Sequence, residues 1–324
     1  MKYIVTGASG LIGSAVVWAL NQRGETDILA VDHLGTSEKW RNLRALHYAD
    51  YLEKEDFIKR LSSGSFASGT KAILHLGACS ATTEKDASYL ISNNFSYTRE
   101  LASFAVSRGI QFLYASSAAT YGGGEQGYVD DVGSIEKLRP LNMYGYSKQM
   151  FDLWAKRKGL FSSIAGMKFT NVFGPNEQHK GEMRSVVLRA YEQICSTGTV
   201  KLFQSHHPDY ADGEFKRDFL YVKDAVDMLL FILDHRLSGL YNIGSGRAET
   251  WNSLASAVFS AMGREPRIEY IPMPESLRAK YQYYTCAEMG RLHAAGYQKE
   301  ARPLKESIRD YVQYYLMRDR FLGD

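Results

Sequence analysis

Two side chains that could carry acid/base chemistry lie one helical turn apart. Tyr144 and Lys148 stand four residues apart in MYGYSKQM, so on a helix the phenol and the ammonium share one face. A phenol of ordinary pKa, near ~10, is a weak base at neutral pH, but an adjacent ammonium and an oxidised nicotinamide ring favour the phenolate. Tyr144 could then accept a proton from an alcohol that loses hydride. Because such pairs also occur on surface helices, the interpretation depends on the rest of the chain.

A glycine-rich turn supplies the partner for that chemistry. The stretch TGASGLIGS places Gly7, Gly10 and Gly13 between an expected strand and an expected helix. The missing side chains allow a tight turn, close approach of a pyrophosphate to the backbone, and packing of the helix against the strand. The helix N-terminus would then face the phosphates. In combination with Tyr144, this turn predicts a dinucleotide-dependent redox site.

Charged residues near the ends of the next strands bear on the choice of dinucleotide. Asp32 ends the second expected strand, where a carboxylate can accept hydrogen bonds from the adenosine ribose and favours NAD. Lys39 and Lys54 follow strand ends near the same ribose, and their ammonium groups could neutralise a 2′-phosphate. The two lysines favour NADP, with NAD as the alternative.

A hydroxyl for the reacting oxygen is expected after a later strand. In YASSAATYGG the strand ends near Ala115, so Ser116 and Ser117 emerge at the edge of the sheet where ligands bind. A hydroxyl there can hydrogen-bond an oxygen whose charge changes as hydride leaves. Ser117 is the expected catalytic hydroxyl, and Ser116 is the alternative.

The elements that must position these residues follow from the hydrophobic pattern. Longer amphipathic stretches alternate with four β-rich runs: KYIVTG, DILAVD, KAILHLGA and QFLYASS. That alternation predicts βαβ units, and strands that are apolar on both faces require helices on both sides. We therefore expect an α/β fold with a doubly wound parallel Rossmann sheet, in which ligands bind at the C-terminal ends of the strands.

The second half of the chain has a less regular pattern. The polar stretch QSHHPDYADGEFKRDF interrupts its apolar segments. We expect a smaller mixed α/β C-terminal lobe that binds substrate over residues 171–324, with residues of about 215–250 returning to a Rossmann domain of residues 1–170. Helical periodicity predicts helices at 181–197, 223–235, 250–263 and 303–316.

The composition excludes several classes of protein. The chain has 39 basic and 36 acidic residues, without the dense Lys/Arg block typical of nucleic-acid binding. It shows no signal peptide and no run that approaches the ~18 apolar residues of a membrane span. Cys79, Cys195 and Cys286 are widely spaced, which indicates neither a disulfide framework nor a zinc site. We expect a cytoplasmic protein with no metal, nucleic-acid or membrane partner.

Taken in order, the motifs resemble the extended short-chain dehydrogenase/reductases. The glycine turn, Ser117, the Tyr144–Lys148 pair and the stretches NVFGP, KRDFLYV and YNIGSG cover most of the chain. Within that family the chain is similar to the epimerases that act at C6 of an ADP-linked heptose, on the stretches HLGACSATTEKD, FLYASSAATYGG, PLNMYGYSK, HKGEM and RAKYQYYTCAEM. The resemblance implies an NADP-dependent isomerase that makes a precursor of the lipopolysaccharide inner core through a 6-keto intermediate. It also implies a homo-oligomer, such as a pentamer.

The same resemblance implies a role for Lys180, the lysine of HKGEM. In that family this lysine is a second acid/base that faces the tyrosine. Inversion needs hydride to return to the opposite face of a planar ketone, which calls for a second proton donor or a large re-docking of the substrate. Tyr144 and Lys180 would then serve one epimer each. A solvent-exposed lysine or a cofactor contact is the alternative interpretation.

The resemblance implies further contacts with both ligands. The planar guanidinium of Arg217 suits a diphosphate, with a salt bridge to Asp218 or Asp224 as the alternative. Around the cofactor the implied contacts are Leu11, Ile12, His33, Leu76, Gly77, Ala78, Cys79, Ser80, Asn93, Val172 and Lys180. Around the nucleotide-sugar they are Ser117, Asn171, Glu182, Arg189, Phe203, Gln204, Ser205, His206, Arg217 and Tyr281.

Departures from the family pattern keep other functions open. Glu182, Arg189 and the lengthened loop at 205–214 all lie on the substrate side, so the sugar and nucleotide are less defined than the redox chemistry. A 4-epimerase would share the serine, tyrosine and lysine but would not require Lys180. A non-catalytic dinucleotide sensor could dispense with Tyr144, whose presence favours an enzyme. A 4,6-dehydratase is disfavoured, because Ala118 and Ala119 replace the acidic pair of that group.

Overall fold

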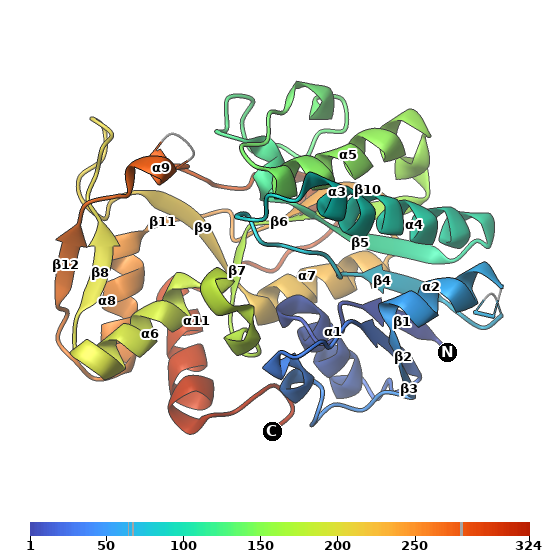
Figure 1. Cartoon of the computed structure of the whole chain (residues 1–324), viewed down its shortest axis with the longest axis horizontal. Coiled ribbons are helices and arrows are strands. Elements are labelled where there is room, and N and C mark those ends of the chain that lie inside the picture. The colour runs from blue at the N-terminus through green and yellow to red at the C-terminus, as the bar shows by residue number, and fades with distance from the viewer. Residues whose placement is uncertain (64, 67, 279–280) are drawn as a thin grey trace.

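The computed structural model of the chain describes residues 1–63, 65–66, 68–278 and 281–324. Two residues of the RAKYQYYTCAEM stretch, Ala279 and Lys280, lie outside the described part. The centre of the molecule is a seven-stranded sheet in the order β10-β6-β5-β4-β1-β2-β3, whose neighbouring strands all pair in parallel (Figure 1). Its strands are β1 (Tyr3–Thr6), β2 (Ile28–Asp32), β3 (Asp50–Glu53), β4 (Ala72–His75), β5 (Gln111–Ser117), β6 (Ile164–Phe169) and β10 (Gly239–Ile243).

Helices cover both faces of this sheet because successive strand residues point to opposite sides. In β1, Ile4 belongs to one buried apolar cluster and Val5 to another. One face packs on α1 (Leu11–Gln22) and α7 (Val222–Asp234). The other packs on α2 (Lys54–Ser62), α4 (Tyr97–Ser107) and α5 (Met143–Arg157). The expected doubly wound parallel fold is confirmed.

A smaller part built on two short sheets lies to the left in Figure 1. Its three-stranded sheet has the order β11-β9-β7, and its two-stranded sheet pairs β12 with β8. These strands are β7 (Asn171–Phe173), β8 (Val200–Phe203), β9 (Lys216–Tyr221), β11 (Ala248–Thr250) and β12 (Ile268–Ile271). The helices around them are α6 (Val186–Thr197), α8 (Trp251–Ala261), α9 (Glu275–Arg278) and α11 (Leu304–Asp310), whereas α10 (Gly290–Ala294) packs against β10 of the large sheet.

The start of α6 differs from the helix expected at 181–197. Residues Gln178–Met183 form a short 3-10 segment, η6, in which Gly181 has φ +53°. The α-helix begins only at Val186, where the hydroxyl of Ser185 accepts a hydrogen bond from the Leu188 N–H. The positive φ of Gly181 interrupts the chain directly after Lys180, so the short 3-10 segment that carries Lys180 does not continue into α6.

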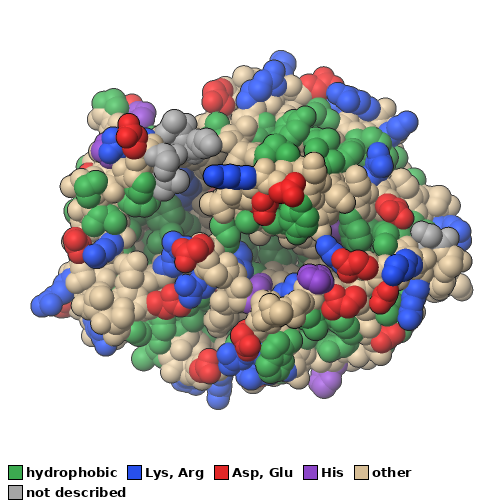
Figure 2. Space-filling view, viewed as in Figure 1, with side chains coloured by type: hydrophobic (Ala, Val, Ile, Leu, Met, Phe, Trp, Pro, Cys, Tyr) green, Lys and Arg blue, Asp and Glu red, His purple; other side chains and the backbone are tan. Residues whose placement is uncertain are grey.

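The strand order places a ligand crevice at the middle of the sheet. The chain runs outward from β1 through β2 to β3, then crosses back so that β4 pairs with the other side of β1. In open parallel sheets, ligands bind outside the carboxyl ends of the strands at this reversal. Figure 2 shows that the surface is hollowed near the middle, with apolar walls and with Lys, Arg and His side chains at the rim. Among the described residues, no helix is long and apolar enough to cross a membrane.

Candidate active site

The turn between β1 and α1 is built so that only glycine fits. Gly7 has φ +68°, and a Cβ there would lie 2.5 Å from the backbone nitrogen of Gly77. A Cβ on Gly13 would lie 1.9 Å from the Gly7 carbonyl oxygen. Gly10 begins α1 without a side-chain cap, so the helix N-terminus is left for a ligand. This cradle fits the pyrophosphate of a dinucleotide, as the sequence predicts.

The residues expected around the cofactor line two adjoining hollows. The glycine-loop cavity, of about 440 Å³, is lined by Gly7, Gly10, Leu11, Ile12, Gly13, Asp32, Lys39, Leu76, Gly77, Ala78, Cys79, Ser80, Tyr144, Lys148, Val172 and Lys180, among others. The ribose-end cavity, of about 190 Å³, adds His33, Lys54 and Asn93. Sequence positions far apart are thus brought to one crevice at the carboxyl ends of the strands.

Two lysines are held at the ribose end by polar partners. The Lys39 ammonium lies 2.7 Å from an Asp32 carboxylate oxygen, and the other oxygen accepts hydrogen bonds from the N–H and hydroxyl of Ser9. The Lys54 ammonium donates to the Asn93 amide oxygen over 2.7 Å. Asp32 is therefore partly neutralised by Lys39, which reduces its repulsion of an additional phosphate at this end.

The ribose end also holds a group with metal-ligand spacing. Ligand atoms of His33, Glu53 and Glu55 lie within 4.8 Å of one another in the described part of the chain. His33 Nδ1 is 3.1 Å from a Glu53 oxygen, and its side chain is 61% exposed. Two exposed partners and an ordinary His–Glu contact do not by themselves indicate a bound metal.

Helix α5 presents Tyr144 and Lys148 to the glycine-loop cavity. The Asn142 side chain caps its start by accepting the Gly145 N–H over 2.8 Å. The Lys148 ammonium is buried and donates to the Ala115 carbonyl over 2.7 Å. Burial lowers the pKa of Lys148 to about 8, while the Asp152 carboxylate opposes that change. Asp152 thus favours the ammonium form of Lys148.

Tyr144 and Ser117 form the polar centre of the crevice. Burial raises the pKa of Tyr144, and a hydrogen bond with Ser117 opposes this rise. Ser117 lines both large cavities, and its oxygen accepts the Ala119 N–H over 3.1 Å. Ser116 also lines the glycine-loop cavity, but its hydroxyl donates to the buried Asp152 carboxylate. The structure therefore turns the Ser117 side chain to the crevice and the Ser116 side chain to the interior.

Lys180 is brought to the same crevice from η6. It lines both the glycine-loop cavity and a second large hollow, as Tyr144 does. Burial lowers the pKa of Lys180, and the Glu177 carboxylate opposes that change. Two ionisable side chains from different elements can thus face a ligand that bridges the two hollows.

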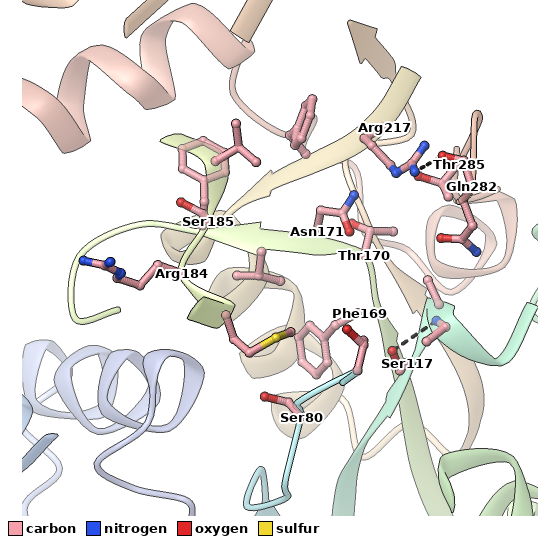
Figure 3. Close-up of a pocket in the computed structure, with 18 of the residues that line it drawn as sticks. Ser80, Ser117, Phe169, Thr170, Asn171, Arg184, Ser185, Arg217, Gln282 and Thr285 are labelled. Atoms are coloured by element: carbon pink, nitrogen blue, oxygen red, sulfur yellow. Dashed lines mark hydrogen bonds between the residues drawn. The ribbon is translucent and has the colours of Figure 1, made fainter. Parts of the chain in front are cut away.

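That second hollow, the lobe cavity, has a volume of about 450 Å³ and lies between the sheet and the smaller part. Figure 3 shows Ser117 and Ser80 below it, Arg217, Gln282 and Thr285 on one side, and Arg184 and Ser185 on the other. Of the residues expected around the substrate, those that line it are Ser117, Asn171, Arg217 and Tyr281.

Arg217 brings an uncompensated charge to the lobe cavity. Its guanidinium donates to the backbone carbonyls of Lys216 and Gln282, and it lies 5.3 Å from the Tyr281 ring centroid. No carboxylate among the described residues forms an ion pair with it, and the neighbouring Asp218 accepts hydrogen bonds from Ser245 instead. A buried cation with no anionic partner suits an anionic ligand group.

The remaining residues expected around the substrate lie outside the lobe cavity. Arg189 forms an ion pair with Glu182, whose side chain is 91% exposed. The Phe203 ring packs edge-on against Tyr281 at 6.4 Å. Gln204, Ser205 and His206 continue from β8 into the loop and do not line the cavity.

Several lining residues were not expected from the sequence. His179 lines the glycine-loop cavity, and Trp251 and Gln282 line the lobe cavity. His179 directly precedes Lys180 in the HKG stretch, so its place beside Lys180 could have indicated that it also lies near the cavity. Trp251 begins α8 and Gln282 lies in a loop, and the approach of both to the crevice depends on the tertiary fold.

A family model and several known proteins match this chain. Residues 3–244 match the model of the family described as "NAD dependent epimerase/dehydratase family". The ADP-L-glycero-D-manno-heptose-6-epimerase of Nitratidesulfovibrio vulgaris strain Hildenborough is 52% identical over 315 residues, which span 97% of this chain and 98% of that protein. The protein of the same name from Fusobacterium nucleatum is 47% identical over 98% of both chains.

Solved structures share the fold. The crystal structure of Helicobacter pylori ADP-L-glycero-D-manno-heptose-6-epimerase matches with a TM-score of 0.82 at 23% identity, over 97% of this chain and 95% of that one. The UDP-glucose 4-epimerase of Thermus thermophilus in complex with NAD matches with a TM-score of 0.76 at 24% identity, over 98% of this chain and 99% of that one.

Proposed function

The chain belongs to the NAD dependent epimerase/dehydratase family as an epimerase, and we propose that it inverts C6 of ADP-D-glycero-D-manno-heptose to give the L-glycero epimer. The product would serve the synthesis of the lipopolysaccharide inner core. The observation that supports this most directly is that Tyr144 and Lys180, from separate elements, line the same two cavities. Inversion at one carbon needs proton transfer at two orientations of the same oxygen, and two acid/base groups meet that need.

The residues of the glycine-loop and ribose-end cavities would hold the cofactor. When bound, the nicotinamide supplies the removal of hydride from C6 and its return. Lys39 and Lys54 favour NADP, because both ammonium groups stand at the ribose end where a 2′-phosphate would lie. Residues 1–170 then form most of the cofactor domain, and residues 171–324 form mainly the substrate lobe, with about 215–250 returning to the sheet.

The acid/base groups would act on the C6 oxygen in turn. Tyr144 accepts the hydroxyl proton of one epimer, with Ser117 hydrogen-bonded to the reacting oxygen and the Lys148 ammonium favouring the phenolate. The C6 ketone then turns, and Lys180 gives a proton to the oxygen in its second orientation. Before the next turnover, Tyr144 releases its proton to solvent and Lys180 takes one up, which restores both groups to their first state.

The lobe cavity would hold the nucleotide-sugar. Arg217 offers its uncompensated guanidinium to the diphosphate, and Asn171 and Tyr281 line the same hollow. Six residues expected around the substrate lie outside the cavity: Glu182, Arg189, Phe203, Gln204, Ser205 and His206. Contacts from them would require the segments that carry them to move toward the bound ligand.

A proton NMR time course with purified protein and ADP-D-glycero-D-manno-heptose tests this function. We expect both C6 epimers to form without net formation of reduced cofactor, and catalytic NADP⁺ is added in a parallel sample in case bound cofactor is lost on purification. UDP-glucose serves as the comparison substrate. Conversion of UDP-glucose to UDP-galactose without conversion of the ADP-heptose would contradict the proposal and indicate a 4-epimerase.

A further inference from the structure

A fully buried ion pair lies directly behind the catalytic residues. The Lys168 ammonium is 3.0 Å from the Asp152 carboxylate, and the two side chains are 0% and 1% exposed. Removing two charges from water costs several kcal/mol per ion, and apolar residues of similar size often do as well or better for stability. The pair therefore needs an explanation other than stability alone.

Asp152 continues the spacing of the catalytic pair along α5. Tyr144, Lys148 and Asp152 follow one another at intervals of four residues, so they share one face of the helix. The Asp152 carboxylate accepts hydrogen bonds from Tyr114 over 2.7 Å and from Ser116 over 2.8 Å, both on β5. One turn beyond Lys148, α5 is thus tied to the strand that ends in the catalytic serine.

Lys168 connects the same carboxylate to the other side of Ser117. Lys168 lies opposite Ser116 in the β5–β6 register, and its ammonium donates to the Thr120 hydroxyl over 2.5 Å. The Thr120 hydroxyl in turn donates to the Ser117 carbonyl over 2.7 Å. A chain of contacts therefore leads from α5 through β6 to the backbone of the catalytic serine.

We propose that the Asp152–Lys168 pair positions the catalytic centre, holding Ser117 against Tyr144 and Lys148 and setting the charge that Tyr144 experiences. The proposal rests on the proposed function only in its use of Tyr144 as the acid/base group. With both members present, the buried cluster of Lys148, Lys168 and Asp152 contains two cations and one anion. The cluster therefore carries one net positive charge on the face of α5 that also carries Tyr144, and a positive charge on that side favours the phenolate.

Other charged and titratable groups around the cluster come from several elements. Lys148 faces Cys79 from the loop after β4 and the buried His75 of β4. Lys168 faces the ring of Tyr121, at 4.9 Å from its centroid, and the carboxylate of Asp130. None of these groups is replaced in the variants proposed below. Opposite shifts in the pKa of Tyr144 in the two variants would therefore be caused by the loss of Asp152 or of Lys168.

The test uses two single variants that remove one charge each. Asp152→Asn removes the anion and leaves two cations, so the pKa of Tyr144 falls; Lys168→Met removes one cation, so it rises. We expect the rising limb of the pH profile of kcat/KM to move to lower pH in the first variant and to higher pH in the second, each by about one unit. The double variant should return to the wild-type midpoint with kcat lowered about tenfold, because the contacts that position Ser117 are lost.

A second measurement needs no substrate. The ultraviolet absorbance of the Tyr144 phenolate, taken as the difference between each protein and its Tyr144→Phe counterpart, should titrate with the same opposite shifts. Because this signal is independent of turnover, it tests the proposal even if the substrate is not an ADP-heptose. Asp234→Asn, which breaks the half-exposed ion pair with Arg23, is the matched control and should shift neither readout.

Shifts in the same direction, or no shift in folded single variants, would overturn the proposal. Either single variant changes the net charge of the buried cluster and could fail to fold. The double variant then decides, since it keeps the net charge of the wild-type cluster. A double variant with wild-type kcat would refute the positioning role, and a midpoint displaced from that of the wild type would refute the charge balance.

Discussion

The backbone N–H of Lys180 donates to the carbonyl of Glu177, whose side chain is fully buried three residues earlier. The Glu177 carboxylate accepts hydrogen bonds from the Ser185 N–H over 2.6 Å and the Ser185 hydroxyl over 2.7 Å. It therefore joins the turn that carries the lysine to the cap of α6. Burial raises the pKa of Glu177, and Lys180 opposes that rise, so the two groups stabilise each other's charged forms.

Replacing Glu177 by Gln should alter the alkaline side of the activity profile. The carboxylate favours the ammonium of Lys180, so its loss lowers the pKa of Lys180 further below the ordinary value. We expect epimerase activity to fall at lower pH on the alkaline limb than in the wild type, as measured by kcat across pH. Glu182→Gln, at an exposed position in the same segment, is the control and should leave the limb in place. An unchanged limb in folded Glu177→Gln would show that the carboxylate does not act on Lys180.

Tyr144→Phe and Lys180→Met should each lose the reaction while the fold and cofactor binding persist. Each removes one acid/base group, a change that typically costs 10²- to 10⁴-fold in rate. Initial rates from each epimer, together with the cofactor content of the purified protein, check this. Lys201→Met, a half-exposed lysine on β8, is the control. Full activity of Lys180→Met from both epimers would remove Lys180 from the mechanism.

Lys39→Met and Lys54→Met should weaken NADP binding more than NAD binding. Each substitution removes one cation from the ribose end, and only NADP carries the additional phosphate there. We expect Kd for NADP to rise about tenfold in each variant, close to the ~1.4 kcal/mol that such a change represents, with a much smaller change for NAD. Fluorescence titration of cofactor-free protein measures both. Equal losses for the two dinucleotides would contradict the assignment of NADP.

Acid should destabilise the protein through His75. This buried ring lies between the hydroxyls of Thr6 and Thr98, and burial lowers its pKa to about 3, with a smaller effect of Lys148 in the same direction. The unfolded chain binds the proton near the ordinary pKa of ~6.5 and the folded chain does not, so stability is lost as pH falls from ~6.5 toward 3. Burial similarly lowers the pKa of His179 to about 4.

The measurement is the Tm across that pH range. We expect His75→Gln to flatten the decline in Tm relative to the wild type, although its Tm at neutral pH is lower because packing is disturbed. His47→Gln, at an exposed histidine, should keep the wild-type slope. An equally steep decline in His75→Gln would mean that other groups cause the acid sensitivity.

The sequence allowed the parallel fold to be predicted because its signals are local. Each strand run is short and apolar on both faces, and the glycines of the first turn tolerate no side chain, as Gly7 and Gly13 show. Tyr144 and Lys148 could be paired because helical spacing alone puts them on one face. The cofactor cavities could be anticipated for the same reason, since parallel strands bring their carboxyl ends to one edge.

What could not be predicted depends on contacts between distant segments. Lys168 lies in an apolar strand, and the residues around it in the sequence give no sign of its buried ion pair with Asp152. Trp251 reaches the lobe cavity from the start of α8 and Gln282 reaches it from a loop, and the smaller sheets set the place of both. Arg189, which departs from the family pattern at a position expected to contact substrate, pairs with Glu182 and lies outside the cavity.

The central claim, that one hydrogen leaves C6 and returns to it from the other side, is tested most directly with ADP-D-glycero-D-manno-heptose that carries deuterium at C6. The reaction is run in ordinary water, and the deuterium content of both epimers is measured by NMR and mass spectrometry. The account predicts that deuterium stays at C6 in the product, with Tyr144 and Lys180 exchanging only the oxygen-bound proton. Replacement of the deuterium by solvent hydrogen would contradict it, because inversion would then proceed by removal of the hydrogen on C6 as a proton.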